Sequence, residues 1–341
     1  MKPLLSYESI QSVLKDTSPG TTEALAQEAA ALTRQYFGRT MSLYAPIYLS
    51  NHCSSFCTYC GFNNRQKIKR IKLSLTEIQN EMRQVSQTGI ENILLLTGES
   101  YAMTPISYLQ DAVEAARGHF TGISLEVHPM ETDEYRALYR QGVDGITVYQ
   151  ETYNRKRYQE VHLGGKKKNY DYRLGTPERA ARAGMRSISL GILLGLGDTA
   201  EDLLALFQHL RSLEKNYPAV EYSLSFPRLR QIKGQGLAPQ TIDDIAFTKI
   251  ICLARIFFPR VGINLSTREP PRLRDHLIEC GVTRMSAGSK TSVGGYTLAD
   301  PSAQDPQFDI QDNRSVDDIL KMLKQRDFDP VFTDWRPIPN I

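Results

Sequence analysis

Three of the chain's five cysteines, Cys53, Cys57 and Cys60, lie within a single short segment with the spacing C-x3-C-x2-C. Three thiolates are one ligand short of the four that close a structural zinc site or an ordinary four-iron cluster, so a metal bound here would keep one position open. Thiolates are soft ligands that suit iron–sulfur clusters. The spacing therefore predicts a cluster that can bind and activate a further molecule.

Other kinds of cysteine site fit the sequence less well. A zinc site would need a fourth ligand, and the nearest candidate, His52, directly adjoins Cys53, which is awkward geometry. An odd number of unevenly spaced cysteines in a long chain disfavours a disulfide scaffold. Cys252 and Cys280 are isolated and are interpreted as small buried hydrophobic residues. No HExxH or Ser-His-Asp string supports hydrolytic zinc chemistry.

Length and charge limit the class of protein. At 341 residues the chain could form one large α/β barrel, and it has no apolar run of the about 18 residues that cross a bilayer. Oxidation-sensitive thiolates and the lack of an export signal predict a cytoplasmic location. The net charge of +3 is too small to indicate a nucleic-acid partner. The basic runs at residues 67–72 and 166–168 are interpreted as solvated loops, although the first could border the mouth of a site.

Apolar runs alternate with helical patterns along the chain. The runs lack the polar alternation of half-exposed strands and predict buried parallel strands at residues 43–49, 93–96, 123–127, 145–149, 187–194, 221–226, 262–266 and, more weakly, 282–285. Helices are predicted after Ser74 and Thr76, ending at Gly89, and at residues 105–117, 132–141, 177–183, 200–214, 242–257 and 271–279. Eight strand–helix units close most naturally into a (β/α)8 TIM-type barrel of the α/β class.

The barrel does not account for the whole chain. Residues 1–40 are predicted to form a helical N-terminal extension, residues 41–296 the barrel, and residues 297–341 a C-terminal tail that packs on it, with one helix near residues 316–324. No linker that would divide the chain into two domains is evident.

Polar strings follow the predicted strands, where the functional loops of such barrels lie. The cysteine loop follows the first strand, and further strings occupy residues 97–99 (TGE), 150–153 (QETY), 195–198 (GLGD) and 266–269 (STRE). Because the carboxyl ends of parallel strands meet at one face, we expect a single site there.

Each of these strings also has an ordinary structural explanation. The carboxylate of Glu99 could accept a hydrogen bond from an ammonium group, but TGE is also common turn chemistry. The glycines of residues 191–198 could expose backbone to a flat group such as adenine, while Asp198 could cap a helix.

A second carboxylate site is suggested by Arg268. Its guanidinium could hold a carboxylate through two hydrogen bonds, or could pair with Glu269 or Asp275. Ser286 and Ser289 could add hydroxyl contacts to the same ligand.

Taken together, these residues resemble the radical S-adenosylmethionine (SAM) enzymes, whose three-cysteine loop binds a [4Fe–4S] cluster. Within that superfamily the chain resembles the tyrosine lyases of thiamine biosynthesis, also called 2-iminoacetate synthases. The matching strings run from Tyr48 to Trp335 and are YLSNHCSSFCTYCGF, LLLTGE, VYQETY, HLGGKKK, YRLGTPERAARAGM, YSLSFPRLR, LSTREPPRLRD and FTDW. The first string indicates only the superfamily, whereas the set is specific.

The resemblance implies a role for each matching position. The clustered cysteines would hold three irons, and SAM would chelate the fourth through its amino and carboxylate groups. The implied SAM contacts are Tyr59 near adenine, Gly98 and Glu99 at the ammonium, Glu126 at the ribose, Arg173 at the carboxylate, and Gly191, Leu193 and Asp198 in the adenine-binding segment. Leu193 and Asp198 depart from the family's GxIxGxxE pattern, which puts a side-chain role for the acid in doubt. Arg268 would hold the substrate carboxylate, with Ser286 nearby.

The implied reaction begins when the reduced cluster passes an electron to SAM. The resulting 5′-deoxyadenosyl radical takes a hydrogen atom from L-tyrosine. Family precedent favours the amino group as the donor, and the phenol is the alternative that stays open. Cleavage of the Cα–Cβ bond then yields 2-iminoacetate (dehydroglycine) and p-cresol, while SAM becomes 5′-deoxyadenosine and methionine. The implied partners are thiazole synthase (ThiG), which would accept the dehydroglycine, and a low-potential electron donor such as flavodoxin or ferredoxin.

Several rival interpretations stay open on sequence alone. HydG, the tyrosine lyase of hydrogenase maturation, carries a second cysteine cluster in a C-terminal extension, and here no cysteine follows Cys280. A tryptophan lyase would hold the carboxylate of its substrate with an arginine in the same way. A non-catalytic iron–sulfur sensor would have no need of Glu99, Arg173 and the 191–198 segment.

Overall fold

Eight parallel strands close into a barrel in the computed structural model, which describes residues 6–230, 240–297 and 306–333. The barrel strands are β1 (Thr40–Ser50), β3 (Asn92–Thr97), β4 (Gly122–Glu126), β5 (Gly145–Glu151), β7 (Ser187–Ile192), β8 (Glu221–Ser225), β9 (Gly262–Leu265) and β10 (Arg284–Ser286). β10 pairs with β1 through Ser42–Arg284 and Tyr44–Ser286, which closes the sheet. The predicted (β/α)8 fold is confirmed, and each barrel strand overlaps a predicted apolar run.

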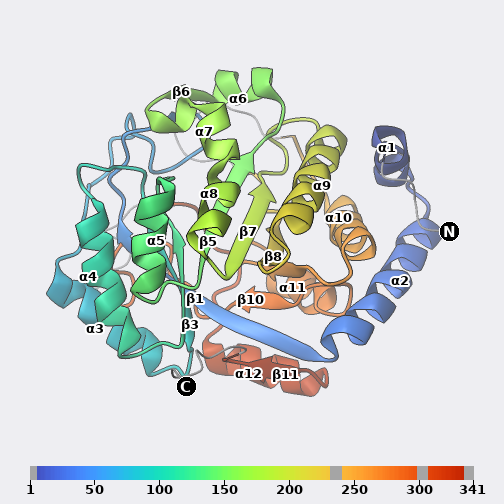
Figure 1. Cartoon of the computed structure of the whole chain (residues 1–341). Helices are drawn as coiled ribbons and strands as arrows, with labels where there is room; N and C mark the ends of the chain where they lie inside the picture. The colour runs from blue at the N-terminus through green and yellow to red at the C-terminus, as the bar shows by residue number, and fades with distance from the viewer. Residues whose placement is uncertain (1–5, 231–239, 298–305, 334–341) are drawn as a thin grey trace.

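Helices that follow the strands surround the barrel (Figure 1). They are α3 (Leu75–Ser86), α4 (Ile106–Arg117), α5 (Thr132–Arg140), α8 (Thr176–Ala183), α9 (Thr199–Asn216), α10 (Asp244–Phe257) and α11 (Pro271–Leu277). The α3 helix begins as its sequence predicts, because Ser74 and Glu77 form a reciprocal capping box. None of the described helices combines the length and the apolar composition needed to cross a bilayer.

Two helices precede the barrel, α1 (Tyr7–Lys15) and α2 (Pro19–Phe37). α2 packs against α10 through a small apolar cluster that contains Ala29, Cys252 and Ile256, with Cys280 at its margin. Cys252 is therefore the buried hydrophobic residue that the sequence predicts, whereas Cys280 is only partly buried.

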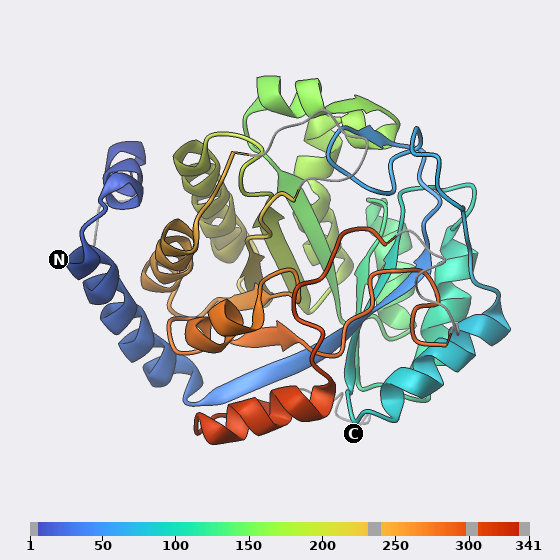
Figure 2. The same cartoon turned by 180° about the vertical axis from the view of Figure 1, so that it is seen from behind.

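The C-terminal region adds α12 (Val316–Gln325) and a strand that sequence analysis missed, β11 (Asp329–Val331). β11 pairs in parallel with Thr40–Ser42, and α12 lies below the start of β1 in Figure 2. This pairing explains why β1 begins before its predicted apolar run. A three-residue strand with a central proline has no alternation by which it could be recognised.

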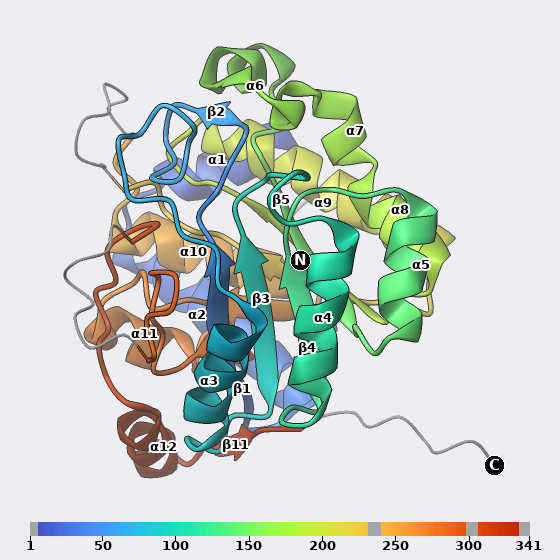
Figure 3. The same ribbon diagram turned by 90° about the vertical axis from the view of Figure 1, so that its left-hand side faces the viewer.

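A small second layer covers the end of the barrel that is opposite to β11. It consists of β2 (Phe56–Cys57), α6 (Arg155–Val161), β6 (His162–Gly164), the 3-10 turn η1 (Lys166–Lys168) and α7 (Tyr170–Leu174). β2 belongs to the cysteine loop and pairs antiparallel with β6. Figure 3 shows β2 and α6 at the end of the barrel toward which β3 points, so this layer stands over the carboxyl ends of the strands.

Candidate active site

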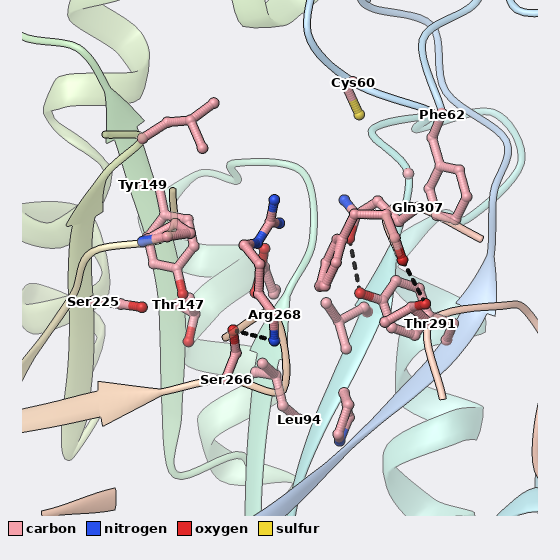
Figure 4. A pocket seen from close by; sticks show the side chains of 18 of the residues that line it. Cys60, Phe62, Leu94, Thr147, Tyr149, Ser225, Ser266, Arg268, Thr291 and Gln307 are labelled. Carbon is pink, nitrogen blue, oxygen red and sulfur yellow. Dashed lines mark hydrogen bonds between the residues drawn. The ribbon is translucent and has the colours of Figure 1, made fainter. Parts of the chain in front are cut away.

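The largest concentration of predicted site residues lines one cavity of about 180 Å³ at the carboxyl ends of the strands (Figure 4). The predicted residues on its walls are Cys53, Cys57, Tyr59, Cys60, Gly98, Glu99, Glu126, Arg173, Leu193, Arg268, Ser286 and Ser289. They come from most of the barrel's strand ends and from the cysteine loop. The expectation of a single site at this face therefore agrees with the cavity.

The cysteine loop is held close to the end of β3. A Cβ atom at Gly98 would lie 2.4 Å from the carbonyl oxygen of His52, so only glycine permits this approach. The Ser54 amide donates to the carbonyl oxygen of Glu99 at 2.9 Å. Arg70 stabilises the loop by donating hydrogen bonds to the carbonyl oxygens of Asn51 and Phe62. Part of the basic run at residues 67–72 therefore supports the cysteine loop and is not simply solvated.

The three thiols share a shielded environment. Cys57 is buried, and Cys53 and Cys60 are partly buried. Burial raises the pKa of all three thiols, to about 11 for Cys53. Because a metal binds the thiolate form, binding here must displace protons, and the three sulfurs suit iron better than a hard cation.

Glu99 has one oxygen engaged and one free. Arg173 donates from Nη1 to Oε1 of Glu99 at 2.7 Å, whereas Oε2 is buried and has no hydrogen-bond partner among the described residues. Burial would raise the pKa of Glu99, but the charges of Arg173 and Lys167 outweigh it and lower this pKa. A buried carboxylate oxygen without a donor is costly, so this atom is suited to a ligand that brings an N–H group.

Sequence analysis missed Lys167 as a site residue, and it gave no individual role to Glu151 of the QETY string. Lys167 Nζ lies 2.8 Å from Glu151 Oε1 and 3.9 Å from Glu99 Oε1, and its side chain is only 12% exposed. The interpretation of residues 166–168 as a solvated loop is wrong for this middle residue, because the η1 turn directs it into the cavity while Lys166 and Lys168 stay exposed. Glu151 has a φ of 71°, unusual for a residue other than glycine.

Tyr59 is buried and joined to His162, a residue expected in a loop. The Tyr59 hydroxyl lies 2.7 Å from His162 Nε2, and His162 Nδ1 lies 2.8 Å from the carbonyl oxygen of Tyr158. Burial, together with the charge of Lys167, lowers the pKa of His162 to about 2, so the ring is neutral. Its Nδ1–H therefore donates to the carbonyl, and Nε2 accepts from Tyr59.

Arg268 is a partly buried cation that has no carboxylate partner among the described residues. None of the ion pairs in the described part of the chain includes it, and its Nε has no hydrogen-bond partner there. Its guanidinium lies 3.7 Å from the ring centroid of Phe308, and burial lowers its pKa. Figure 4 shows Arg268 between Tyr149 and Gln307 in this view, with Cys60 above them.

The alternative salt bridges considered for Arg268 are wrong. Glu269 accepts from Arg228 and Arg230, and Asp275 pairs with Arg314 at 2.7 Å. The neighbouring acids therefore pair with other arginines, and Arg268 lines the cavity without a carboxylate partner among the described residues.

Other predicted residues contribute in different ways. Ser286 Oγ accepts from the Thr267 amide at 3.1 Å, whereas Ser289 Oγ is buried without a partner among the described residues. Burial and the charge of Glu151 raise the pKa of Glu126 to about 7. This carboxyl is thus partly protonated at neutral pH and can donate as well as accept a hydrogen bond.

Two predicted SAM-binding residues lie outside the cavity lining. Asp198 caps α9 by accepting from the Glu201 amide at 2.9 Å, so the structure shows the helix-cap alternative at this position. A Cβ atom at Gly191 would lie 2.6 Å from both the Tyr149 ring and the Ser225 carbonyl oxygen. Gly191 therefore permits Tyr149, which does line the cavity, to pack against β7.

Gln307 and Phe308, from the C-terminal region, also line the cavity. Tyr48 donates to Gln307 Oε1 at 2.8 Å, and Thr291 donates to the Phe308 carbonyl oxygen at 2.9 Å. No sequence signal marked these residues, because their role depends on a segment that folds back over the barrel. Asp334 and Trp335 of the FTDW string lie outside the described residues.

Fold and site together define a radical SAM enzyme. Residues 47–210 match the model of the Radical SAM superfamily, and residues 225–329 match the Biotin and Thiamin Synthesis associated domain. Membership of this superfamily implies a [4Fe–4S] cluster and SAM as cofactors.

The individual relatives narrow the class further. The chain is 39% identical to the 2-iminoacetate synthase of Salmonella typhimurium and 40% identical to that of Escherichia coli, in each case over 97% of this chain and 88% of the relative. The chain belongs to the 2-iminoacetate synthase family of radical SAM lyases.

Solved structures support the same placement. A crystal structure of HydG, a maturase of the [FeFe]-hydrogenase, matches with a TM-score of 0.90 at 28% identity, over 98% of this chain and 74% of HydG. HydG from Carboxydothermus hydrogenoformans matches with a TM-score of 0.88 at 34% identity, over 96% of this chain and 76% of that one. The 2-iminoacetate synthases are both more similar in sequence and more completely covered.

Proposed function

We propose that the protein is a 2-iminoacetate synthase that cleaves the Cα–Cβ bond of L-tyrosine to 2-iminoacetate and p-cresol, and converts SAM to 5′-deoxyadenosine and methionine. The observation that carries the proposal is that one cavity brings together three thiols, a carboxylate and a partly buried arginine. Among the described residues, one oxygen of that carboxylate has no hydrogen-bond partner, and the arginine has no carboxylate partner. These groups match a cluster, the ammonium of SAM and the carboxylate of an amino acid.

The cluster would be held by Cys53, Cys57 and Cys60, which all line the cavity. The glycine at position 98 lets the cysteine loop approach the end of β3, so these cysteines would hold the cluster beside the strand ends. When bound, the reduced cluster and SAM supply the radical that removes a hydrogen atom from the substrate.

SAM would be oriented mainly by the paired Glu99 and Arg173. The free Oε2 of Glu99 would accept from the ammonium, and Arg173, which already holds Oε1, would place its remaining N–H groups against the SAM carboxylate. Tyr59 and Leu193 offer apolar surface to the adenine, and Glu126 offers hydrogen bonds to the ribose. Gly191 would contribute indirectly, because it permits the packing of Tyr149 beside the cavity. We assign Asp198 to the helix cap only.

L-Tyrosine would be held by its carboxylate on Arg268. Phe308 packs on the guanidinium of Arg268 and limits its movement, so the N–H donors of this group are already oriented before substrate binds. Ser286 stands nearby, although its hydroxyl is engaged by the Thr267 amide, and the unpartnered Ser289 hydroxyl is the better free donor. The apolar walls, which include Phe62 and Leu96, would exclude water from the radical chemistry.

The remaining assignments rest on family membership alone. We propose that thiazole synthase accepts the dehydroglycine, that a flavodoxin or ferredoxin supplies the electron, and that the protein acts in the cytoplasm.

An activity assay tests the proposed reaction. Anaerobically reconstituted protein, reduced with dithionite and given SAM and L-tyrosine, should release p-cresol and 5′-deoxyadenosine in equal amounts, together with glyoxylate from hydrolysis of 2-iminoacetate. Turnover of L-tryptophan alone would refute the tyrosine assignment. Release of carbon monoxide or cyanide would favour a HydG-like enzyme. A reduced cluster whose electron paramagnetic resonance (EPR) spectrum does not change when SAM is added would favour a sensor.

A further inference from the structure

The loop of residues 162–168, which we call the basic loop, is docked directly on the cysteine loop. Phe56 pairs with Gly164 and Cys57 with His162 across the β2–β6 ladder, and the Thr58 amide donates to the carbonyl oxygen of Val161 at 2.9 Å. The two loops therefore share backbone hydrogen bonds, although they are about a hundred residues apart in the chain.

Close packing fixes the position of the basic loop. Gly165 has a φ of 77°, and a Cβ atom there would lie 2.5 Å from the Ser55 Cα, so the two backbones touch where a side chain would separate them. The Lys167 amide donates to Ser55 Oγ at 3.4 Å, and its carbonyl oxygen accepts from the Tyr158 hydroxyl at 2.5 Å. Lys167 is thus anchored by its backbone beside the cysteines.

The side chain of Lys167 places a positive charge in the cavity that the cysteines line. Its Nζ lies 5.8 Å from the ring centroid of Tyr59, the residue between Cys57 and Cys60. Burial opposes a charged amine, but Glu151 and Glu99 hold the ammonium in its protonated form.

We propose that Lys167 is an electrostatic positioning residue for the cluster, whose ammonium makes one-electron reduction of the cluster easier. The inference rests on the proposed cluster at the three cysteines. In the step concerned, one electron passes from a low-potential donor to the cluster, which becomes more negative by one charge, while Lys167 keeps its proton and no bond forms or breaks. A buried cation stabilises such a charge far more than an exposed one.

The surrounding charges explain why this lysine matters. Arg173 already serves Glu99, so the removal of Lys167 would leave Glu151 without its close cation and Glu99 with one fewer. The negative charges of the two carboxylates would then repel the three thiolates and the added electron without the compensating charge of Lys167. The loss of Lys167 should therefore oppose reduction, and the loss of the Glu151 charge should favour it.

An EPR-monitored redox titration without SAM tests this prediction on reconstituted protein, using Lys167→Met, Lys167→Arg, Glu151→Gln and, as a matched control, the exposed neighbour Lys168→Met. We expect Lys167→Met to show about a tenfold lower ratio of reduced to oxidised cluster at a fixed potential, equal to about 59 mV for one electron. Lys167→Arg and Lys168→Met should stay close to the unmodified protein, and Glu151→Gln should shift in the opposite direction.

The outcomes separate this inference from the proposed function. A full iron content with an unchanged potential in Lys167→Met would overturn it and would indicate a purely structural lysine. If Lys167→Met cannot hold a cluster, the sign of the Glu151→Gln shift decides, because easier reduction supports the inference and any other result contradicts it. Failure of the unmodified protein to assemble a reducible cluster would instead refute the proposed function.

Discussion

Arg173 donates to one oxygen of Glu99 at 2.7 Å, and the other oxygen is buried without a partner among the described residues. This arrangement orients the carboxylate in advance and reserves one oxygen for a donor that the described protein atoms do not provide. The pair thereby couples β3 to α7 across the cavity.

Glu99→Gln should weaken SAM binding. The amide keeps the shape but loses the charge that strengthens a hydrogen bond to an ammonium, a loss of about 2 kcal/mol, or about 30-fold in affinity. The SAM concentration that half-saturates the change in the EPR spectrum would measure it. Glu114→Gln, on the exposed face of α4, serves as the control. Unchanged affinity in Glu99→Gln would remove Glu99 from the SAM site.

Cys57→Ala should abolish cluster assembly, because two remaining thiolates cannot hold three irons. Iron and sulfide content after reconstitution would measure the loss. Cys280→Ala, which alters a cysteine outside the cavity, should retain the full content. A cluster in Cys57→Ala equal to that of the unmodified protein would require different ligands.

Arg268→Ala should weaken tyrosine binding while leaving SAM binding intact. Loss of one member of a buried charge pair costs about 3 kcal/mol, which corresponds to a KM for tyrosine raised about 100-fold. Arg268→Lys, which keeps the charge but not the fork, should be intermediate. Steady-state p-cresol formation and SAM binding would be measured on the same preparations, and equal loss of both ligands would contradict this division of roles.

Glu126 should make the stability of the protein pH-dependent. Its pKa of about 7 in the folded state lies above its ordinary value of 4.5, so the folded protein retains a proton that the unfolded chain releases as pH rises. Stability should therefore fall between about pH 4.5 and 7, by about 2 kcal/mol for a carboxyl that still faces a water-accessible cavity. Urea unfolding of the cluster-free protein at pH 5 and pH 8 would show this decline, and Glu126→Gln should reduce it. An equal decline in the variant would assign the effect to other groups.

Asp198→Ala should reduce stability without affecting SAM. Loss of the α9 cap costs about 1 kcal/mol, and Asp198→Asn should recover most of it because asparagine caps equally well. Thermal unfolding and SAM affinity would be compared in both variants. A loss of SAM affinity in Asp198→Asn would instead restore the acid to the adenine-binding segment.

Sequence and structure agree best where the signal is local. Strand β3 formed at a predicted apolar run, and helix α3 begins directly after Ser74, one of the two predicted starts, because burial and capping depend on residues a few positions apart. They agree least for β11, a short strand whose partner is the start of β1, near the opposite end of the chain.

The sequence by itself determined that three cysteines lie in one short loop, from which the kind of site was predicted, and that eight apolar runs form the barrel that carries this loop. Tertiary structure alone decided which charges meet there. It turned Lys167 toward Glu151, paired Glu269 with Arg228 rather than with Arg268, and brought Phe308 from the C-terminal region onto Arg268. The physical reason is that hydrophobic periodicity specifies elements, whereas the direction of a side chain on a short loop depends on contacts with segments far away in the chain.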